Sequence, residues 1–366
     1  MSQITKPYGL VYNNDNSLCT TIRTDTRPFT GVNSFAVEKS SSNVLTDTES
    51  IIGNWETTNT VQSYAGEHKY NLYIVPLSLD SETLYTPKIE LTTSGIAGEH
   101  TVSIDIQSYK EVTLSVGATI PNATYKDTGY TGRLFVTKTF VNGDKVGITL
   151  PDSYPGTVFN VRHPQIEEGP VATSYVEPSL TRSAGKFVLS SSTLASKGLS
   201  YNNNVIAFWA YIKGIASKHT AGNTDTSAYL FTNTDTSVNG ISLYINSAGN
   251  LIFSTSGAST TTTSTHTLPA KGWHSICLIS DTDSVKFYLD GVSTSTITSN
   301  LPAEINNFCI GSSTGTDQTF NSVIANLYIG LYKNTAGTMI WTDNYIQNLY
   351  AAKRPFIVDQ PALQMV

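Results

Sequence analysis

The stretch that decides the fold is residues 273–297, which read WHSICLISDTDSVKFYLDGVSTSTI. Near its centre, Val285, Phe287 and Leu289 alternate with a lysine and a tyrosine, which is the two-residue period of a strand with one buried face. An Asp-Gly pair follows at positions 290–291, and such a pair readily adopts the positive backbone angles of a tight hairpin turn. The stretch therefore predicts antiparallel strands joined by short turns.

The same pattern recurs in both halves of the chain. Residues 241–253 predict a second hairpin, and apolar residues alternate again at 102–106 and 112–116, between turns rich in Gly, Pro and Asn. A helical pattern occurs only at 343–352, and Pro355 follows it. Many short strands and almost no helix predict an all-β protein of two antiparallel β-sandwich (jelly-roll) domains in tandem, with one short C-terminal helix.

Composition sets the character of the surface. The chain has 366 residues, enough for two domains of ordinary size, and its charged fraction is 14%, against about 25% for an average soluble protein. Thr and Ser make up a quarter of the residues, so uncharged hydroxyl groups supply much of the polarity. The net charge of -6, with Lys and Arg scattered singly, argues against a nucleic-acid partner. The lack of a run of about 18 apolar residues argues against membrane insertion.

Cysteine usage and the N-terminus bear on the cellular compartment. Cys19, Cys277 and Cys309 cannot all pair within one chain, and no Cys/His cluster accompanies them, so we expect buried thiols rather than disulfides or a zinc site. The first residues lack the basic start and apolar stretch of a secretory signal. We therefore expect synthesis in a cytoplasm, whatever the final destination.

A change of charge and a loop-like stretch divide the chain. Residues 1–180 contain 19 acidic and 12 basic residues, whereas residues 181–366 contain 9 and 10. Residues 168–185 hold two prolines and two glycines without a strand pattern, so we place the junction there. The predicted organisation is an N-terminal arm and anchor (1–36), a first sandwich (37–180), a second sandwich (181–352) and a C-terminal tail (353–366). The alternative for the arm is an edge segment of the first sandwich.

Short motifs surround the junction between the two predicted domains. Residues 164–169 read PQIEEG, residues 172–178 read ATSYVEP, and a Thr-Arg pair follows at 181–182. This wording resembles a recurring arrangement in bacteriophage tail and fibre proteins. In that arrangement a carbohydrate-binding-module-like jelly roll ends with such a segment, and a lectin-like sandwich follows.

The second half carries motifs of its own. Residues 205–213 read VIAFWAYIK, residues 272–274 read GWH, and residues 320–329 read FNSVIANLYI. Together with the hairpin at 285–291, these resemble the concanavalin A-like or laminin G-like superfamily. The two resemblances span about residues 37–352, and they imply a lectin-type fold in the second half.

Candidate binding residues follow from the chemistry of sugars. A sugar ring presents C–H surfaces that pack on flat aromatic side chains, flanked by hydroxyl and amide groups. In the first domain, Trp55, Tyr64, Tyr70 and Tyr73 supply such side chains, and the alternative for each is a place in the core or on a sheet face.

Calcium is the one metal that the resemblance implies. Laminin G-like loops often bind it through oxygen ligands, and Asp225, Asp235 and Asn239 lie in a loop-rich stretch of the second domain. No EF-hand spacing accompanies them, so polar turn residues are the alternative.

Catalysis is not expected. Glycoside hydrolysis uses two positioned carboxyl groups, and laminarinase-like enzymes carry them as Glu-x-Asp-x-x-Glu on one strand, a pattern that is absent here. Glu304 is the one glutamate after residue 180, while Glu167 and Glu168 are adjacent and are expected to be surface carboxylates on opposite sides of a strand. The six histidines are dispersed without metal-ligand spacing, and we expect lone polar side chains.

The expected function is binding without chemistry. The leading hypothesis is a non-enzymatic phage virion appendage protein, made in the host cytoplasm and displayed on the particle exterior, that binds host-surface polysaccharide or other glycan for adhesion. Its expected partners are that glycan, other virion proteins and further copies of itself in a homo-oligomer, because linked copies strengthen weak sugar binding. One alternative is a purely structural virion protein of the baseplate, tail or capsid decoration, and another is a capsule depolymerase.

Overall fold

The structure is a computed structural model of residues 1–366. It describes the following residues: 4–6, 10–12, 18–23, 28–29, 32, 34–39, 41–50, 54–58, 60–64, 71–76, 87–120, 123–150, 159–170, 172–173, 175–182, 187–220, 223, 227–233, 240–256, 261–298, 301, 306–313, 318–353 and 362–365.

The chain forms two compact units, and one is inserted into the other. The inserted unit is Ser41–Arg182, and the split unit combines Met1–Ser40 with Ser183–Val366. The two ends of the inserted unit lie side by side, because β5 (Ser41–Ser42) pairs antiparallel with β14 (Thr181–Arg182). The hydroxyls of Ser42 and Thr181 also share a hydrogen bond of 2.7 Å.

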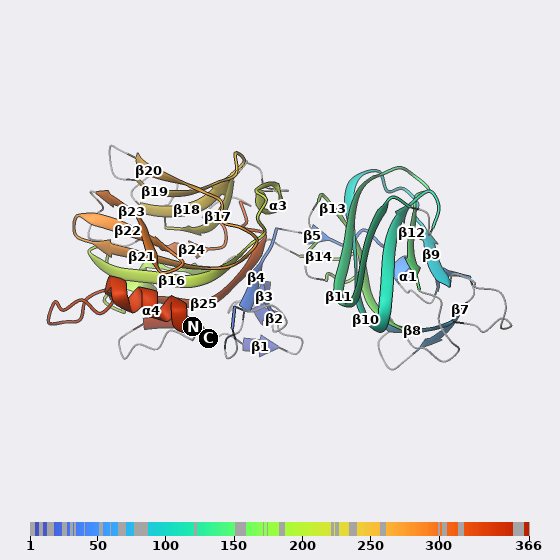
Figure 1. Ribbon diagram of the computed structural model, residues 1–366, viewed down its shortest axis with the longest axis horizontal. Helices are drawn as coiled ribbons and strands as arrows, with labels where there is room; N and C mark the ends of the chain where they lie inside the picture. The colour runs from blue at the N-terminus through green and yellow to red at the C-terminus, as the bar shows by residue number, and fades with distance from the viewer. Residues whose placement is uncertain are drawn as a thin grey trace. The chain divides into compact units, whose positions relative to one another are not determined.

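The inserted unit is a β-sandwich whose strands run in the sheet order β6-β9-β12-β10-β13-β8-β7, with β11 on the free side of β10 (Figure 1). Its elements are α1 (Asp47–Ser50), β6 (Glu56–Thr58), β7 (Thr60–Tyr64), β8 (Asn71–Pro76), β9 (Lys88–Thr92), β10 (Gly98–Gly117), β11 (Tyr125–Phe140), β12 (Lys145–Thr149) and β13 (Phe159–Glu168).

The long strand β10 joins the two layers of this sandwich. Residues 98–107 pair with β11 on one side and face β13 on the other, whereas residues 113–117 face β12. The register shifts between Gln107 and Val112, which is how a strand turns the corner from one layer to the other. Apolar side chains from both halves of β10 and from its neighbours then fill one core, which includes Val102, Leu114, Ile148 and Ile166.

The split unit contains two sheets. The ten-stranded sheet has the order β1-β2-β3-β4-β25-β16-β21-β22-β23 with β26 beside β25, and the six-stranded sheet has the order β15-β24-β17-β18-β19-β20. The strands of the first sheet are β1 (Ile4–Lys6), β2 (Leu10–Tyr12), β3 (Leu18–Arg23), β4 (Ser34–Val37), β16 (Asn203–Ile212), β21 (Gly272–Asp281), β22 (Ser284–Leu289), β23 (Val292–Thr298), β25 (Ser322–Gly330) and β26 (Ala362–Met365). Those of the second are β15 (Phe187–Leu189), β17 (Ser227–Thr232), β18 (Gly240–Asn246), β19 (Asn250–Ser256), β20 (Thr261–Thr267) and β24 (Phe308–Ile310).

The core of the split unit lies between its two sheets. Phe208 and Phe287 from the ten-stranded sheet pack in one cluster with Leu243 and Phe253 from the six-stranded sheet, and all four are fully buried. A second cluster lies on the other side of the ten-stranded sheet, where helix α4 (Asp343–Ala352) covers Trp209 (Figure 1). Three layers therefore form this unit.

Strand β4 ties the N-terminal segment into the split unit. Residues 34–37 pair antiparallel with β25, and the backbone N–H of Lys39 donates to Asn321 Oδ1 at 2.6 Å. Gly311, at φ 80°, packs against Val37 so closely that a Cβ atom would overlap the valine side chain. The segment that we expected to form an arm thus supplies a fully buried strand at its end.

The hairpin predicted at residues 273–297 is β21, β22 and β23, and the turn at 290–291 has the expected positive angles, with φ 54° at Asp290 and 78° at Gly291. A Cβ atom on Gly291 would lie 3.2 Å from the backbone of Gln347, so glycine also lets α4 approach. Asp290 stabilises the start of β21, because its carboxylate accepts hydrogen bonds from the backbone N–H of Ser275 at 2.9 Å and from the His274 ring at 2.8 Å.

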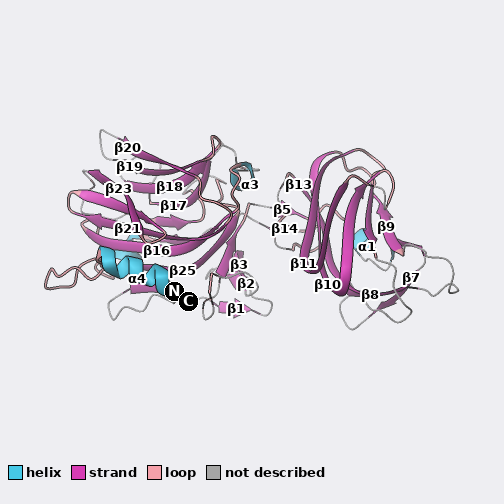
Figure 2. Ribbon diagram, in the orientation of Figure 1, coloured by secondary structure: helices cyan, strands magenta, loops and turns pink. Residues whose placement is uncertain are grey.

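Helices are few, as Figure 2 shows, and the predicted all-β class and C-terminal helix are both confirmed. Helix α4 begins after Thr342, whose hydroxyl accepts a hydrogen bond from the N–H of Tyr345. Besides α1, two further helices were not predicted, α2 (Ser191–Ala195) and α3 (Ser217–Thr220). Within the described residues, every helix is too short to cross a membrane.

The pairing of Ser41 with Arg182 predicts that the inserted unit folds without the rest of the chain, because its ends need no other strand to hold them together. We expect residues 41–182, expressed alone, to unfold in one cooperative thermal transition and to give a dispersed amide spectrum. The complementary chain, with residue 40 joined to residue 183 by a short Gly-Ser linker, should behave likewise. A broad, non-cooperative transition in residues 41–182 would contradict the assignment.

Candidate functional site

The outer face of the six-stranded sheet carries uncharged side chains, most of them polar. The inner face belongs to the core, so the residues between the core residues of a strand point to the outer face. The register aligns the outward residues in two rows across four strands. The first row is Tyr229, Tyr244, Ile252 and Thr265. The second row is Thr232, Ser242, Ser254 and Thr263.

Two tyrosines form the flat part of this face, which we call the hydroxyl face after the eight residues of the two rows. The rings of Tyr229 and Tyr244 stack with centroids 4.9 Å apart and planes 27° apart. Partial burial raises the pKa of the Tyr244 phenol, which keeps the hydroxyl protonated and able to donate a hydrogen bond at neutral pH.

In the second row Thr232, Ser242 and Ser254 are buried, so Thr263 is the hydroxyl of that row that a ligand can reach. The hydroxyls of Thr232 and Ser242 lie 3.0 Å apart in a hydrogen bond, whereas Thr263 and Thr265 at the edge strand β20 are exposed. No residue of the hydroxyl face is charged. An aromatic platform beside neutral hydroxyls suits a ligand with both C–H surfaces and hydroxyl groups.

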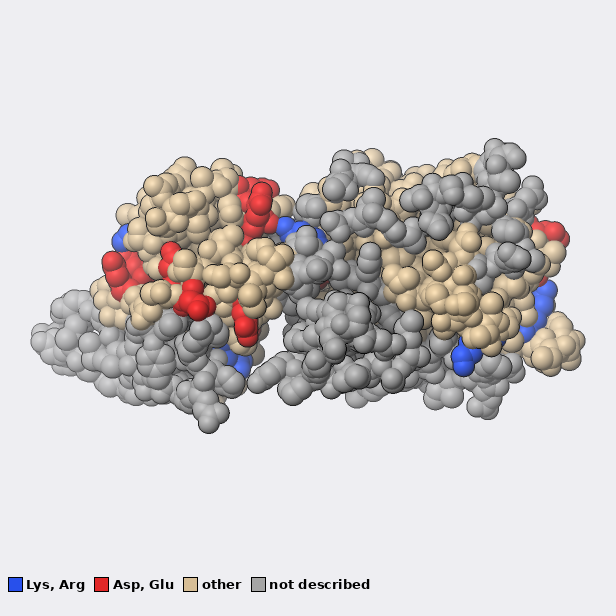
Figure 3. Space-filling model, turned by 180° about the vertical axis from the view of Figure 1, so that it is seen from behind, with Lys and Arg blue, Asp and Glu red and all other residues tan. Residues whose placement is uncertain are grey.

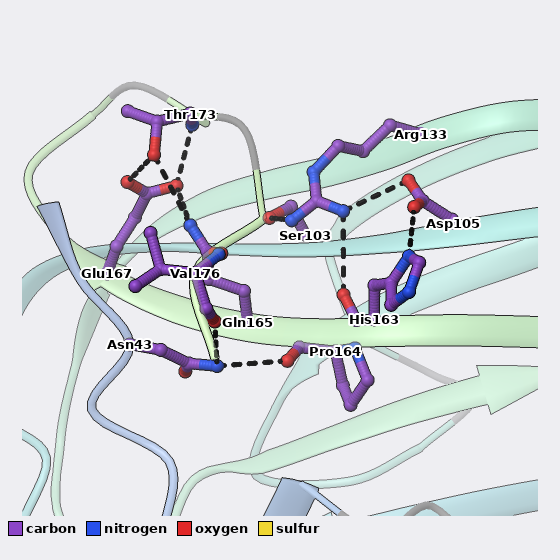
Figure 4. Close-up of polar contacts among 10 residues, drawn as sticks. All are labelled: Asn43, Ser103, Asp105, Arg133, His163, Pro164, Gln165, Glu167, Thr173 and Val176. Atoms are coloured by element: carbon purple, nitrogen blue, oxygen red, sulfur yellow. Dashed lines mark hydrogen bonds and ion pairs between the residues drawn. The ribbon is translucent and has the colours of Figure 1, made fainter. Parts of the chain in front are cut away.

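A second polar cluster lies in the inserted unit, on the face of β10, β11 and β13 that points away from the core (Figure 4). Arg133 donates from one terminal nitrogen to Asp105 Oδ1 at 3.0 Å and from the other to Ser103 Oγ at 2.7 Å. The ring Nδ1 of His163 bonds the other oxygen of Asp105 at 2.8 Å. These hydrogen bonds and charges outweigh partial burial and lower the pKa of Asp105 to about 2.

A β-bulge positions His163. The register of β10 and β13 shifts between Ser103 and Asp105, and His163 has φ 55°, a left-handed conformation that is uncommon for histidine. The bulge turns the imidazole towards Asp105 and onto the ring of Tyr175, with centroids 4.5 Å apart. Among the described residues, no hydroxyl or thiol bonds the other ring nitrogen, so this Asp-His pair has no nucleophile in the arrangement of a catalytic triad.

The other end of the same face is closed by the chain itself (Figure 4). Glu167 is fully buried and accepts hydrogen bonds from the hydroxyl of Ser41 and from the backbone N–H and hydroxyl of Thr173. The side-chain Oε1 of the neighbouring Gln165 accepts a hydrogen bond from the backbone N–H of Val176 at 2.7 Å. The prediction that Glu167 is a surface carboxylate is therefore wrong, because Thr173 and residues 175–178 fold back over it, while Glu168 is exposed as predicted.

The Glu167 network explains the two motifs at the junction. PQIEEG supplies the buried carboxylate and amide, and ATSYVEP supplies the hydroxyl and backbone groups that satisfy them. Asn43 adds a clamp, since its amide donates to the carbonyl oxygens of Pro164 and Val176. The motifs thus close the inserted unit.

The four aromatic residues predicted as sugar platforms lie in different parts of the inserted unit. Trp55 is 4% exposed, packs in the core of the inserted unit and donates its indole N–H to the carbonyl of Glu49 at 2.7 Å, so neither ring face is open. Tyr73 lies on β8 opposite Asn160, and Tyr64 lies on β7 opposite Leu72. Tyr70 falls outside the described residues.

The predicted calcium ligands Asp225, Asp235 and Asn239 also lie outside the described residues. Within the described ranges, no group of three His, Cys, Asp or Glu side chains could hold a metal ion.

The histidine in α3 has a structural role. The Nε2 of His219 accepts the backbone N–H of Lys213 at 2.9 Å, and its Nδ1 donates to the carbonyl of Phe320 at 2.9 Å. Complete burial lowers the pKa of His219 to about 3, so the ring stays neutral.

Charge is distributed unevenly over the two units. Figure 3 shows acidic side chains gathered on the inserted unit, whereas the described surface of the split unit on that side is mostly uncharged. This distribution agrees with the charge difference between the two halves of the sequence.

Comparison with known proteins finds a family match within the split unit. Residues 190–332 match the family model of the concanavalin A-like lectin/glucanases superfamily. No curated protein matches the sequence.

Several solved structures are similar at low identity. A heptameric SAP-like pentraxin from Limulus polyphemus is 13% identical, with a TM-score of 0.32, over 45% of this chain and 80% of that chain. Domain 4 of AbnA, a GH43 extracellular arabinanase from Geobacillus stearothermophilus, in complex with arabinotriose, is 20% identical, with a TM-score of 0.30, over 41% and 67%. The CBM40 of the Ruminococcus gnavus IT-sialidase is 12% identical, with a TM-score of 0.31, over 43% and 86%. Similarities at this level do not extend to function.

The lowered pKa of Asp105 predicts a pH-dependent contribution to stability. Because the folded pKa of about 2 lies below the ordinary 3.8, the unfolded chain binds the proton first as pH falls, and stability is lost between about pH 4 and pH 2. We expect Asp105→Asn to lower the free energy of unfolding of the inserted unit by about 2 kcal/mol at pH 7. The measurement is hydrogen exchange of β10 and β13 amides across this pH range. Equal acid sensitivity of variant and wild type would refute the role of Asp105.

Proposed function

We propose that the protein binds a neutral saccharide on the hydroxyl face of the split unit and performs no chemistry on it. The observation that carries this proposal is the partly exposed, stacked pair Tyr229 and Tyr244 on the same sheet face as the exposed hydroxyls of Thr263 and Thr265. The pair lies in a region that matches a superfamily containing lectins and glucanases.

The chemistry of the face fits this ligand better than others. A sugar ring has apolar C–H faces for a tyrosine platform and hydroxyl groups for serine and threonine. A charged ligand would find no counter-charge among the eight residues of the face, and a wholly apolar one would leave the exposed hydroxyls of Thr263 and Thr265 without partners.

We further propose that the saccharide belongs to a host cell surface and that the protein is an adhesion module on a phage particle. The motifs at the junction support this, through their resemblance to phage tail and fibre proteins. Sites of this kind are weak singly, so several copies on one particle would strengthen attachment. Labelling intact virions with an antibody against the protein tests the location, and absence of label from every particle would contradict it.

A glycan array of host-type polysaccharides, probed with the full chain, tests sugar binding directly. We expect Tyr244→Ala to weaken binding of the best neutral ligand about tenfold, the loss of about 1.4 kcal/mol expected for an aromatic platform. Tyr244→Phe should retain the stacking and lose less affinity for this ligand than Tyr244→Ala does.

The matched control is Tyr109→Ala, which removes a tyrosine that is 96% exposed in the inserted unit. This variant should bind the same ligand as the wild type does. Equal binding by Tyr244→Ala and the wild type, with both chains folded by circular dichroism, would exclude the hydroxyl face. The appearance of new reducing ends during incubation would show that the ligand is cleaved and would overturn the non-enzymatic proposal.

A further inference from the structure

The basic residues of the inserted unit differ in how their charges are neutralised. This unit contains 16 acidic and 9 basic residues, so carboxylates are abundant. Lys88, Lys138, Lys145 and Arg133 are all partly buried, and each contacts a carboxylate oxygen at 2.5 to 3.0 Å. Partly buried cations in this unit are therefore normally paired.

Arg162 is the exception among the partly buried cations in the described part of the inserted unit. It lies on β13 directly opposite Asp105 of β10, and its side chain is partly buried, with Nε shielded from water. Its Nε has no hydrogen-bond partner, and no ion pair with a described residue engages its guanidinium. A partly buried cation without a counter-charge loses solvation and gains nothing in return.

Asp105, the acid across from Arg162, is already occupied. Its Oδ1 accepts from Arg133 and its Oδ2 bonds His163 (Figure 4). Asp105 is thus committed to other partners, which leaves the guanidinium of Arg162 open to a carboxylate from outside the unit.

A hydrogen-bond acceptor lies beside the unpaired cation. Asn160 precedes Arg162 by two residues on β13, so the two share a face of the strand, and Asn160 Oδ1 is likewise buried without a partner. Across from Asn160 on β10 is the exposed amide of Gln107. A cation beside amide groups matches a molecule that carries a carboxylate and hydroxyls on one small ring.

We propose that Arg162 and Asn160 form a second binding site, in the inserted unit, for the carboxylate of an acidic saccharide such as a uronic acid. The guanidinium of Arg162 pairs with the carboxylate, and the amides of Asn160 and Gln107 bond the ring hydroxyls. Arg133 and Asp105 hold the sheet beneath in a fixed geometry and are not ligands. This site is independent of the hydroxyl face, because all of its residues lie within residues 41–182.

The test compares a galacturonic acid trisaccharide with its fully methyl-esterified form, which keeps the sugar and removes the charge. Isothermal titration of the full chain should show that the acid binds at least tenfold more tightly than the ester. Added salt should weaken binding of the acid and leave binding of the ester unchanged. Arg162→Gln should remove this preference, and Arg162→Lys should keep part of it, because lysine retains the charge without the planar fork.

Two controls make the outcome decisive. Lys126→Gln removes an exposed positive charge from β11 of the same unit and should leave the preference intact. Tyr244→Ala should also leave it intact, so failure of the hydroxyl face and failure of this site are distinguishable. No binding of the acid, equal binding of acid and ester, or an unchanged preference in a folded Arg162→Gln variant would each overturn the proposal.

Discussion

The alternation of side chains along antiparallel strands is the constraint on which both units depend. In the six-stranded sheet, Leu243 and Phe253 point into the core, and their neighbours Ser242 and Ser254 point outward. A shift of one residue in register would exchange the two sets and place the serine hydroxyls against the apolar core. The same pairing that closes the core therefore fixes which hydroxyl groups lie together outside, and neither face can change without the other.

Local pattern and turn chemistry made most strands predictable, because both act between close neighbours in sequence. The Asp-Gly turn at 290–291 and the alternation beside it are of this kind. The place of β4 was not predictable in this way. Its partner β25 is almost the length of the chain away, and a short apolar strand such as Ser34–Val37 carries no sign of which sheet it joins. The insertion of one unit into the other follows from that single distant pairing.

The sites were harder to predict than the strands. The Thr-rich stretch 261–267 forms β20, and the register that places Thr263 beside Ser254 cannot be predicted from the composition of that stretch alone. Trp55 was predicted as a sugar platform from its residue type, but residue type does not indicate burial. Its indole packs in the core of the inserted unit. Alternation did separate Glu167 from Glu168, but it could not indicate that residues 172–178 return to cover one of them.

Two places on strand β13 of the inserted unit treat polar groups in opposite ways, and this difference follows from how each group is satisfied. At Glu167 the inserted unit meets every oxygen of the carboxylate with its own donors, so that end of the face is structural and has nothing left to offer a ligand. At Arg162, on the same strand, the nearest acid is already engaged and the charge stays unmet. Binding capacity in a polar β-sheet thus depends less on how many polar groups a face carries than on which of them the chain leaves unsatisfied.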